Sequence, residues 1–213
     1  MKINGKRVVM SLCGVLICAV AVGIFKTAAF GVDPFQSLMS GLEQLIPIPF
    51  GTLYVIVNAV LLIFSIAANR RAIGIATFIN LFLLGYITQF SYAFLQTVFP
   101  APSVLVRSAL LAAAIVVMCF GSSLYMTAEL GVSTYDAVAI TMAEKWHWGQ
   151  FRFIRITTDL VCVALGIVCF LAGGGTWQKV PTVAGIATVI TAFFMGPLIQ
   201  FFNEKVARPF LEK

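Results

Sequence analysis

Three aspartates stand in or beside segments that are otherwise apolar, and they are the side chains best suited to chemistry. Asp33 and Asp136 follow Gly-Val pairs, at points where short helices are expected to begin, and Asp159 lies inside an apolar run. A charged side chain within a membrane costs several kcal/mol unless it is paired or in contact with water, so it indicates function by default. The chemistry would be the binding of a substrate, a cation or a coupling proton.

Each aspartate also has a purely structural explanation. Asp33 can cap a helix, and Asp136 can compensate the helix dipole from a first turn, without any ligand. Arg155 and Asp159 are four residues apart, which places them on one helix face as a structural ion pair. A functional role requires Asp159 to face a wet cavity and the two helix starts to face a substrate.

The composition places the whole chain in a membrane. Of its 213 residues, 61% are hydrophobic and 10% are charged, whereas a soluble domain carries about 25% charged residues. The net charge of +6 comes from short flanks between apolar runs, as orientation in a lipid bilayer requires, so we expect no nucleic-acid partner. The first apolar run exceeds the core of a signal peptide, which predicts a retained span.

The two halves of the chain repeat one another. Residues 27–32 (TAAFGV) recur as 127–132 (TAELGV), and residues 74–77 (GIAT) recur as 185–188. Between these blocks Phe50-Gly51 matches Trp148-Gly149, and after them Gly85 matches Gly196 and Gln89 matches Gln200. We therefore predict two copies of one membrane unit, residues 1–99 and 104–213, joined by a linker at 100–103.

Six apolar runs can cross a hydrocarbon core, which needs roughly 20 residues: 8–29, 51–68, 73–94, 104–128, 153–172 and 180–202. A shorter stretch, 34–46 or 134–146, follows the first run of each copy and would reach only about 20 Å as a helix. We predict an all-α transmembrane bundle of two inverted repeats, each with three spans and a re-entrant or interfacial half-helix. In each copy the chain breaks between the first span and the short helix. The inversion would place these two breaks on opposite sides of the membrane. Four short spans per repeat is the alternative.

The distribution of basic residues predicts that both termini are cytoplasmic. With three spans per copy, only Lys26, Arg107 and Lys179 lie outside, which leaves 11 of the 14 Lys and Arg residues inside. Four spans per copy would place 10 Lys and Arg residues inside and 4 outside, which also agrees with an excess of basic residues in the cytoplasm.

Other polar residues complete the set of candidates. Gln89 and Gln200 occupy matched positions, although hydrogen bonding between helices would explain them equally. Glu129 replaces Ala29 of the first copy. The candidate substrate-binding residues are Asp33, Gln36, Gln89, Glu129, Asp136, Asp159 and Gln200. A single histidine and the absence of hydrolase or nucleotide-binding motifs predict no metal, no cofactor and no catalytic residues.

A short motif adds a resemblance to a known group. Gly31-Val32-Asp33-Pro34-Phe35-Gln36-Ser37-Leu38, then Gly41-Leu42 and Phe50-Gly51-Thr52, resemble the recurrent unit of the YczE/YyaS/YitT group of bacterial integral membrane proteins. The chain departs from that unit at Gln36, where an acidic residue is commoner, and at Thr134, where proline is expected. The resemblance implies a bacterial inner membrane and brings no substrate or catalytic residue.

These observations predict a small secondary transporter or permease-like protein in the lipid bilayer, acting on a small molecule. The alternative is an accessory or scaffold protein that assists a neighbouring membrane or biosynthetic complex, as a homo-oligomer or with a partner membrane protein. A substrate-capturing subunit of an ATP-driven importer is a third class.

Overall fold

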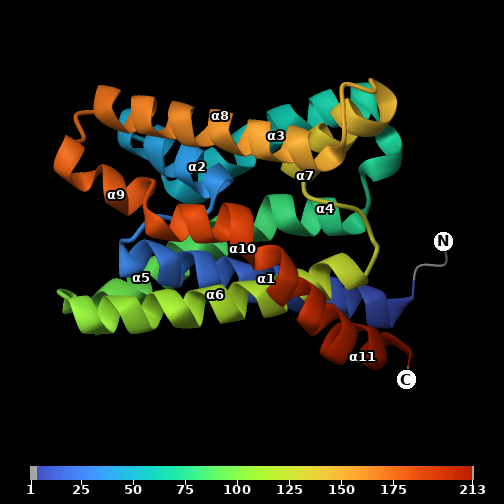
Figure 1. Ribbon diagram of the computed structural model, residues 1–213, viewed down its shortest axis with the longest axis horizontal. Coiled ribbons are helices and arrows are strands. Elements are labelled where there is room, and N and C mark those ends of the chain that lie inside the picture. The colour runs from blue at the N-terminus through green and yellow to red at the C-terminus, as the bar shows by residue number, and fades with distance from the viewer. Residues whose placement is uncertain (1–3, 213) are drawn as a thin grey trace.

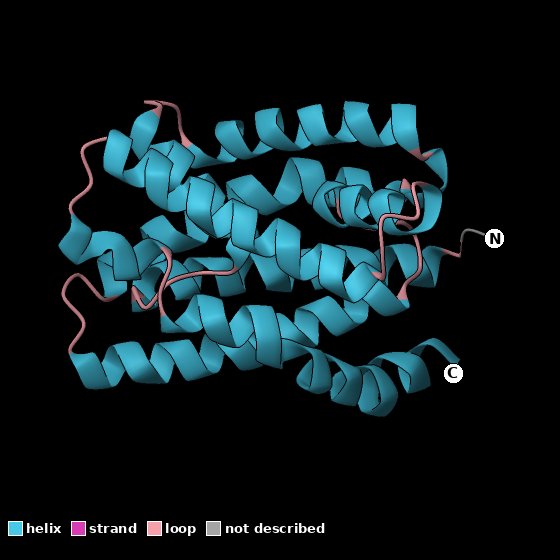
Figure 2. Cartoon of the chain, turned by 45° about the horizontal axis from the view of Figure 1, so that its top comes forward, coloured by secondary structure: helices cyan, strands magenta, loops and turns pink. Residues whose placement is uncertain are grey.

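The protein is built from helices joined by short loops, in a computed structural model that describes residues 4–212 (Figures 1 and 2). The α-helices are α1 (Gly5–Ala28), α2 (Pro34–Leu45), α3 (Phe50–Ala68), α4 (Ile75–Ile79), α5 (Gly85–Val98), α6 (Val104–Thr127), α7 (Thr134–Ile140), α8 (Phe151–Ala172), α9 (Val180–Val183), α10 (Ile186–Phe202) and α11 (Arg208–Glu212). Short 3₁₀ or π-helical turns lie at Arg70–Ala72, Asn80–Leu84, Thr141–Lys145, Trp177–Lys179 and Asn203–Ala207.

Among the described residues, six helical segments are long and apolar enough to span a membrane. They are Gly5–Ala28, Phe50–Ala68, Ile75–Val98, Val104–Thr127, Phe151–Ala172 and Trp177–Leu211, and each overlaps one predicted run. The all-α class and the six candidate spans are thus confirmed. The helices α2 and α7 are shorter than these spans: α2 has 12 residues, and α7 has 7 residues followed by a π-helical turn of 5. The described ends of the chain lie at the same end of the bundle (Figure 1).

The helices form two layers (Figure 1). One layer contains α5, α1, α6 and α10, with α1 in contact with both α5 and α6. The other contains α2, α3, α7 and α8, in which α2 packs on α8 and α7 packs on α3. The centre of the core is α1, where Val22 and Phe25 are at most 1% exposed. Each short helix therefore packs on a long helix from the other half of the chain.

Glycines allow the two breaks in the chain to pass close to other backbone. Gly31 and Gly131, which follow α1 and α6, have φ values of 94° and 109°. A Cβ atom on Gly31 would lie 2.4 Å from the amide nitrogen of Gly185, and one on Gly131 would lie 2.5 Å from that of Gly74. Only glycine combines this left-handed conformation with so close an approach.

An arginine secures the end of each of the two antiparallel helices α1 and α6. Arg7, at the start of α1, donates to the carbonyl of Ala128 at 3.1 Å, and Arg107, at the start of α6, donates to that of Ala28 at 2.8 Å. These carbonyls at a helix end have no partner within the helix, so the guanidinium groups satisfy them. The two breaks consequently begin at opposite ends of the bundle (Figure 1).

Candidate functional site

The starts of α2 and α7 are capped in two different ways. Asp33 caps α2 by accepting from the backbone N–H of Gln36 at 3.2 Å, and Pro34 occupies the first turn. Ser133 caps α7 by accepting from the backbone N–H of Asp136 at 3.0 Å. The cap at Asp33 was predicted from the sequence and is confirmed. The Ser133 hydroxyl also donates to Oδ2 of Asp136 at 2.7 Å, which leaves Oδ1 of that carboxylate for another partner.

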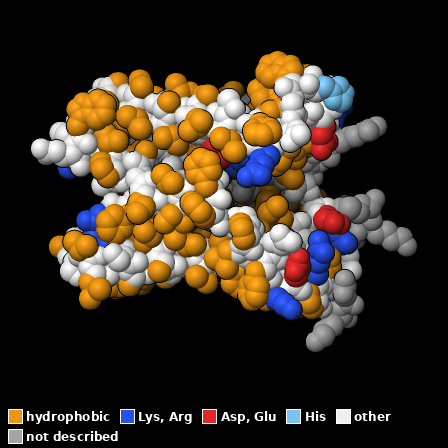
Figure 3. All heavy atoms as spheres, viewed as in Figure 1, with side chains coloured by type: hydrophobic (Ala, Val, Ile, Leu, Met, Phe, Trp, Pro, Cys, Tyr) orange, Lys and Arg blue, Asp and Glu red, His pale blue; other side chains and the backbone are white. Residues whose placement is uncertain are grey.

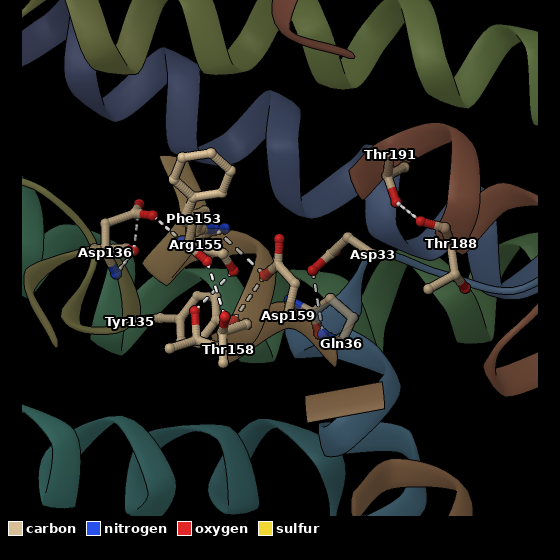
Figure 4. A network of polar contacts seen from close by, with 12 residues as sticks. Asp33, Gln36, Tyr135, Asp136, Phe153, Arg155, Thr158, Asp159, Thr188 and Thr191 are labelled. Atoms are coloured by element: carbon tan, nitrogen blue, oxygen red, sulfur yellow. Dashed lines mark hydrogen bonds and ion pairs between the residues drawn. The ribbon is translucent and has the colours of Figure 1, made fainter. Parts of the chain in front are cut away.

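Arg155 of α8 binds that carboxylate and joins the two aspartates of the second half (Figure 4). Its guanidinium forms an ion pair with Asp136, and its Nε lies 3.4 Å from Oδ1 of Asp159. It also lies over the ring of Tyr135, 4.3 Å from the centroid. We call Asp33, Tyr135, Asp136, Arg155 and Asp159 the Arg155 cluster.

Asp159 is the most enclosed carboxylate of the Arg155 cluster, at 7% exposure. Its Oδ1 accepts from the hydroxyl of Tyr135 at 2.7 Å, in addition to the contact with Arg155. Its Oδ2 has no hydrogen-bond partner among the described residues, and Figure 4 shows that oxygen without a contact. Asp159 lines a cavity, and this oxygen is not among the fully buried atoms that lack a partner, so it is accessible to a ligand.

The charges of the Arg155 cluster do not balance, because one guanidinium pairs with the two carboxylates of Asp136 and Asp159 and the cluster contains a third carboxyl group, that of Asp33. Asp33 lies beside Asp159 in Figure 4. Burial raises the pKa of Asp33 to about 6, although the N–H of Gln36 and the charge of Arg155 oppose the shift. Near neutral pH the cluster therefore carries an excess of negative charge that a proton or another cation would compensate.

Aromatic stacking brings the starts of the two short helices together. Phe35 of α2 stacks on Tyr135 of α7, with centroids 4.9 Å apart and planes 21° from parallel. Phe35 also contacts the ring of Tyr54 edge-on at 6.0 Å. Close by, Thr134 donates to the side chain of Asn58, which is 1% exposed. The two breaks begin at opposite ends of the bundle, but the helices that follow them begin side by side.

A cavity of about 200 Å³ opens between α8 and α10 next to the Arg155 cluster. Asp159, Pro34 and Thr188 line it together with apolar side chains that include Val163 and Val189. Figure 3 shows acidic and basic side chains in the hollow between these two helices. The cavity thus connects an enclosed carboxylate with the outer surface of the bundle.

Three candidates from the sequence lie outside the Arg155 cluster. Gln89 accepts from the backbone N–H of Gly51 at 2.9 Å, and Gln200 donates to Glu204 at 3.0 Å. Glu129 pairs with Arg7 at 3.0 Å, with 64% of its side chain exposed. All three have nearby structural partners and none approaches Arg155.

Gln36 lies in α2 behind Asp33 and is 4% exposed. Its Oε1 is buried and has no hydrogen-bond partner among the described residues. Of the seven candidates from the sequence, the structure therefore brings Asp33, Asp136 and Asp159 into one cluster, and Gln36 lies three residues after Asp33. Within the described part of the chain, no three His, Cys, Asp or Glu side chains are placed to hold a metal ion.

Sequence reasoning missed Tyr135 and Thr188, and it treated Arg155 as a partner of Asp159 alone. One signal could have found Tyr135, because it lies at the position matched by Phe35, directly before Asp136. Thr188 was visible within the repeated 185–188 block. The pairing of Arg155 with Asp136 joins α8 to α7 and had no local signal.

The fold and the cluster define a multi-pass integral membrane protein with a charged site between its helices. The chain belongs to the family of unknown function DUF6198, which it matches over residues 5–204. The predicted resemblance is confirmed by distant similarity to YyaS and YczE of that bacterial group.

The relatives are bacterial and uncharacterised. An uncharacterised protein of Haemophilus influenzae is 24% identical over 95% of this chain and 86% of its own length. YyaS of Bacillus subtilis is 22% identical over 94% of each chain, and the uncharacterised membrane protein YczE of the same organism is 23% identical over 88% of this chain and 81% of its own. No solved structure matches the chain.

Proposed function

We propose that the protein is a small secondary transporter of the bacterial inner membrane, and not an enzyme, with its substrate site at the Arg155 cluster. The observation that carries the proposal is a charged cluster between two short helix starts, beside a cavity. Intramembrane ionisable residues beside a cavity are typical of transport sites, as are interrupted helices that meet inside a bundle. The absence of an ATP-binding motif from the sequence favours a carrier driven by an ion gradient.

The halves of this transporter would be inverted repeats, each with three spans and a half-helix. Matched contacts support the repeat: the carbonyl of Phe30 accepts from Ala187 at 2.9 Å, and that of Leu130 accepts from Ala76 at 3.0 Å. In each pair, the break of one half meets the third span of the other. The short lengths of α2 and α7 and their adjoining starts support the half-helices.

An inverted repeat suggests how access would alternate. The cavity between α8 and α10 is open, whereas α3 and α5, the matched pair of helices, are in contact. If α8 and α10 closed together while α3 and α5 separated, the Arg155 cluster would become accessible from the opposite side of the membrane. With both termini in the cytoplasm, as the basic residues indicate, the two breaks would begin at opposite membrane surfaces.

Metabolite profiling tests whether the protein transports a small molecule. Cells that produce the wild type are compared with cells that produce Asp136→Asn, which keeps the shape of the side chain but removes the charge that binds Arg155. The control is Glu129→Gln, because that carboxylate is exposed and lies outside the cluster. We expect the amount of at least one metabolite to change in cells that produce the wild type or the control, and to stay unchanged in cells that produce Asp136→Asn.

The same profile can contradict the proposal. If no pool differs between cells with and without the wild-type protein, while all variants are present in the membrane in equal amounts, the transport function is wrong. The accessory role would then become the better explanation.

A further inference from the structure

We infer that the cavity between α8 and α10 binds a small organic monocation, with an ammonium group against Asp159 and an apolar body along the helices. This inference deepens the proposed function and rests on it. It goes beyond the presence of a site by naming the charge and the shape of the ligand.

The charge follows from the free oxygen of Asp159. Its Oδ2 has no donor among the described residues, although the residue is 7% exposed and lines the cavity. Arg155 does not neutralise the site, because its single positive charge is shared between the carboxylates of Asp136 and Asp159. A ligand with N–H donors and a positive charge would satisfy this oxygen and balance the cluster. An anion would be repelled.

The apolar body follows from the walls of the cavity. Leu160, Val189 and Phe193 line it and are 59%, 53% and 55% exposed, on helices that are long and apolar enough to lie in lipid. The opening of the cavity therefore faces the bilayer, so an amphiphilic cation could enter from there. The volume of about 200 Å³ lies below the range of about 300–1,000 Å³ for drug-sized ligands, which favours a small molecule.

Calorimetric titration of the full chain in lipid nanodiscs tests the inference. The probe is phenethylammonium, which joins an ammonium group to one ring, and its matched neutral probe is phenethyl alcohol. We expect the wild type to bind the ammonium at least about 10-fold more tightly than the alcohol. Asp159→Asn should lose this preference, and Glu129→Gln should keep it.

A second variant removes the space without changing any charge. Val189→Trp would fill the cavity from α10, so we expect it to weaken phenethylammonium binding at least about 10-fold while melting like the wild type. Equal binding of the two probes by the wild type would overturn the inference. So would unchanged binding by Val189→Trp, even if Asp159→Asn fails to fold.

Proteoliposome flux separates this inference from the proposed function. Specific binding of phenethylammonium that depends on Asp159, without any flux of the bound probe or of other cations, would contradict transport but leave the cation site in place. Transport of a metabolite without a preference for the charged probe would contradict the cation site alone.

Discussion

We call the boundary between two neighbouring helices a seam. At the seam between α3 and α5 the helices are in contact, so it is closed, whereas a cavity keeps the matched seam between α8 and α10 open. At Gly85 of α5, an added Cβ would lie 2.6 Å from the Cβ of Tyr54 in α3. At Gly196 of α10, the position matched in sequence, an added Cβ would meet nothing within 4 Å. Two segments with the same repeated residues therefore occupy different packing states. There is thus no space for a methyl group at Gly85, whereas there is space for one at Gly196.

The matched glutamines follow the same division. Gln89 of α5 reaches across its seam to the backbone N–H of Gly51, at the start of α3. Gln200 of α10 binds Glu204 in the same helical segment instead of reaching α8. A polar contact is thus present across the closed seam, while the corresponding side chain of the open seam bonds locally. The variants below break or sharpen this contrast.

The largest effect is expected from Arg155→Gln, which removes the positive charge beside the open seam. Asp136 and Asp159 would then face each other without compensation. Loss of one member of a fully buried pair costs about 3–5 kcal/mol, so for the partly exposed Arg155 we expect about 2–3 kcal/mol. Thermal unfolding in detergent measures the loss. Arg155→Gln with Asp136→Asn should recover part of it, and an unchanged melting temperature in the single variant would contradict the role of Arg155.

Alanine at the two matched glycines should affect stability differently, with a loss at Gly85 and no loss at Gly196. Gly85→Ala forces a Cβ atom against Tyr54, and overpacking of this kind costs about 1–3 kcal/mol. Gly196→Ala has open space and gains helix propensity, so its melting temperature should stay the same or rise. If transport requires the second seam to close, Gly196→Ala should also slow flux. Equal destabilisation by both variants would show that the seams do not differ.

How far the sequence predicts the molecule depends on the range of the interactions. Local signals located the six candidate spans, the short helices and the cap at Asp33, because hydropathy and first-turn chemistry depend on neighbouring residues. The repeat singled out Gly31 and Gly131 without showing what they approach. The pairing of Arg155 with Asp136 depends on how α7 and α8 pack against each other, and no local sequence pattern encodes that packing.

A smaller effect, which depends on pH, is expected at Asp33, whose side chain caps α2 next to Asp159. Its pKa rises from 3.8 to about 6 on burial, so the folded protein holds the proton more tightly than the unfolded chain. Stability therefore falls as the pH rises through this interval and stays reduced above about 6. Asp33→Asn keeps the cap and removes the titration, and the difference in unfolding free energy between about pH 5 and about pH 7.5 should shrink by about 1–2 kcal/mol.

Thermal unfolding at the two pH values measures that change. Arg155, Asp159 and Gln36 face the carboxyl group, and none of them is altered in Asp33→Asn. Glu129→Gln serves as the control, since its exposed carboxylate should leave the pH dependence as it is in the wild type. An identical pH dependence in Asp33→Asn would mean that another group titrates.

The smallest effect is expected from the glutamines, and it bears most directly on the seams. Gln89→Ala leaves the N–H of Gly51 without its acceptor at 2.9 Å, which should cost about 1 kcal/mol and loosen the start of α3. Hydrogen exchange should then speed up over residues 51–54, while Gln200→Ala should leave exchange at the start of α8 unchanged, because the Gln200 side chain donates to Glu204 and not, among the described residues, to α8. If both variants loosen their seams equally, the contact across α3 and α5 is not what distinguishes the closed seam from the open one.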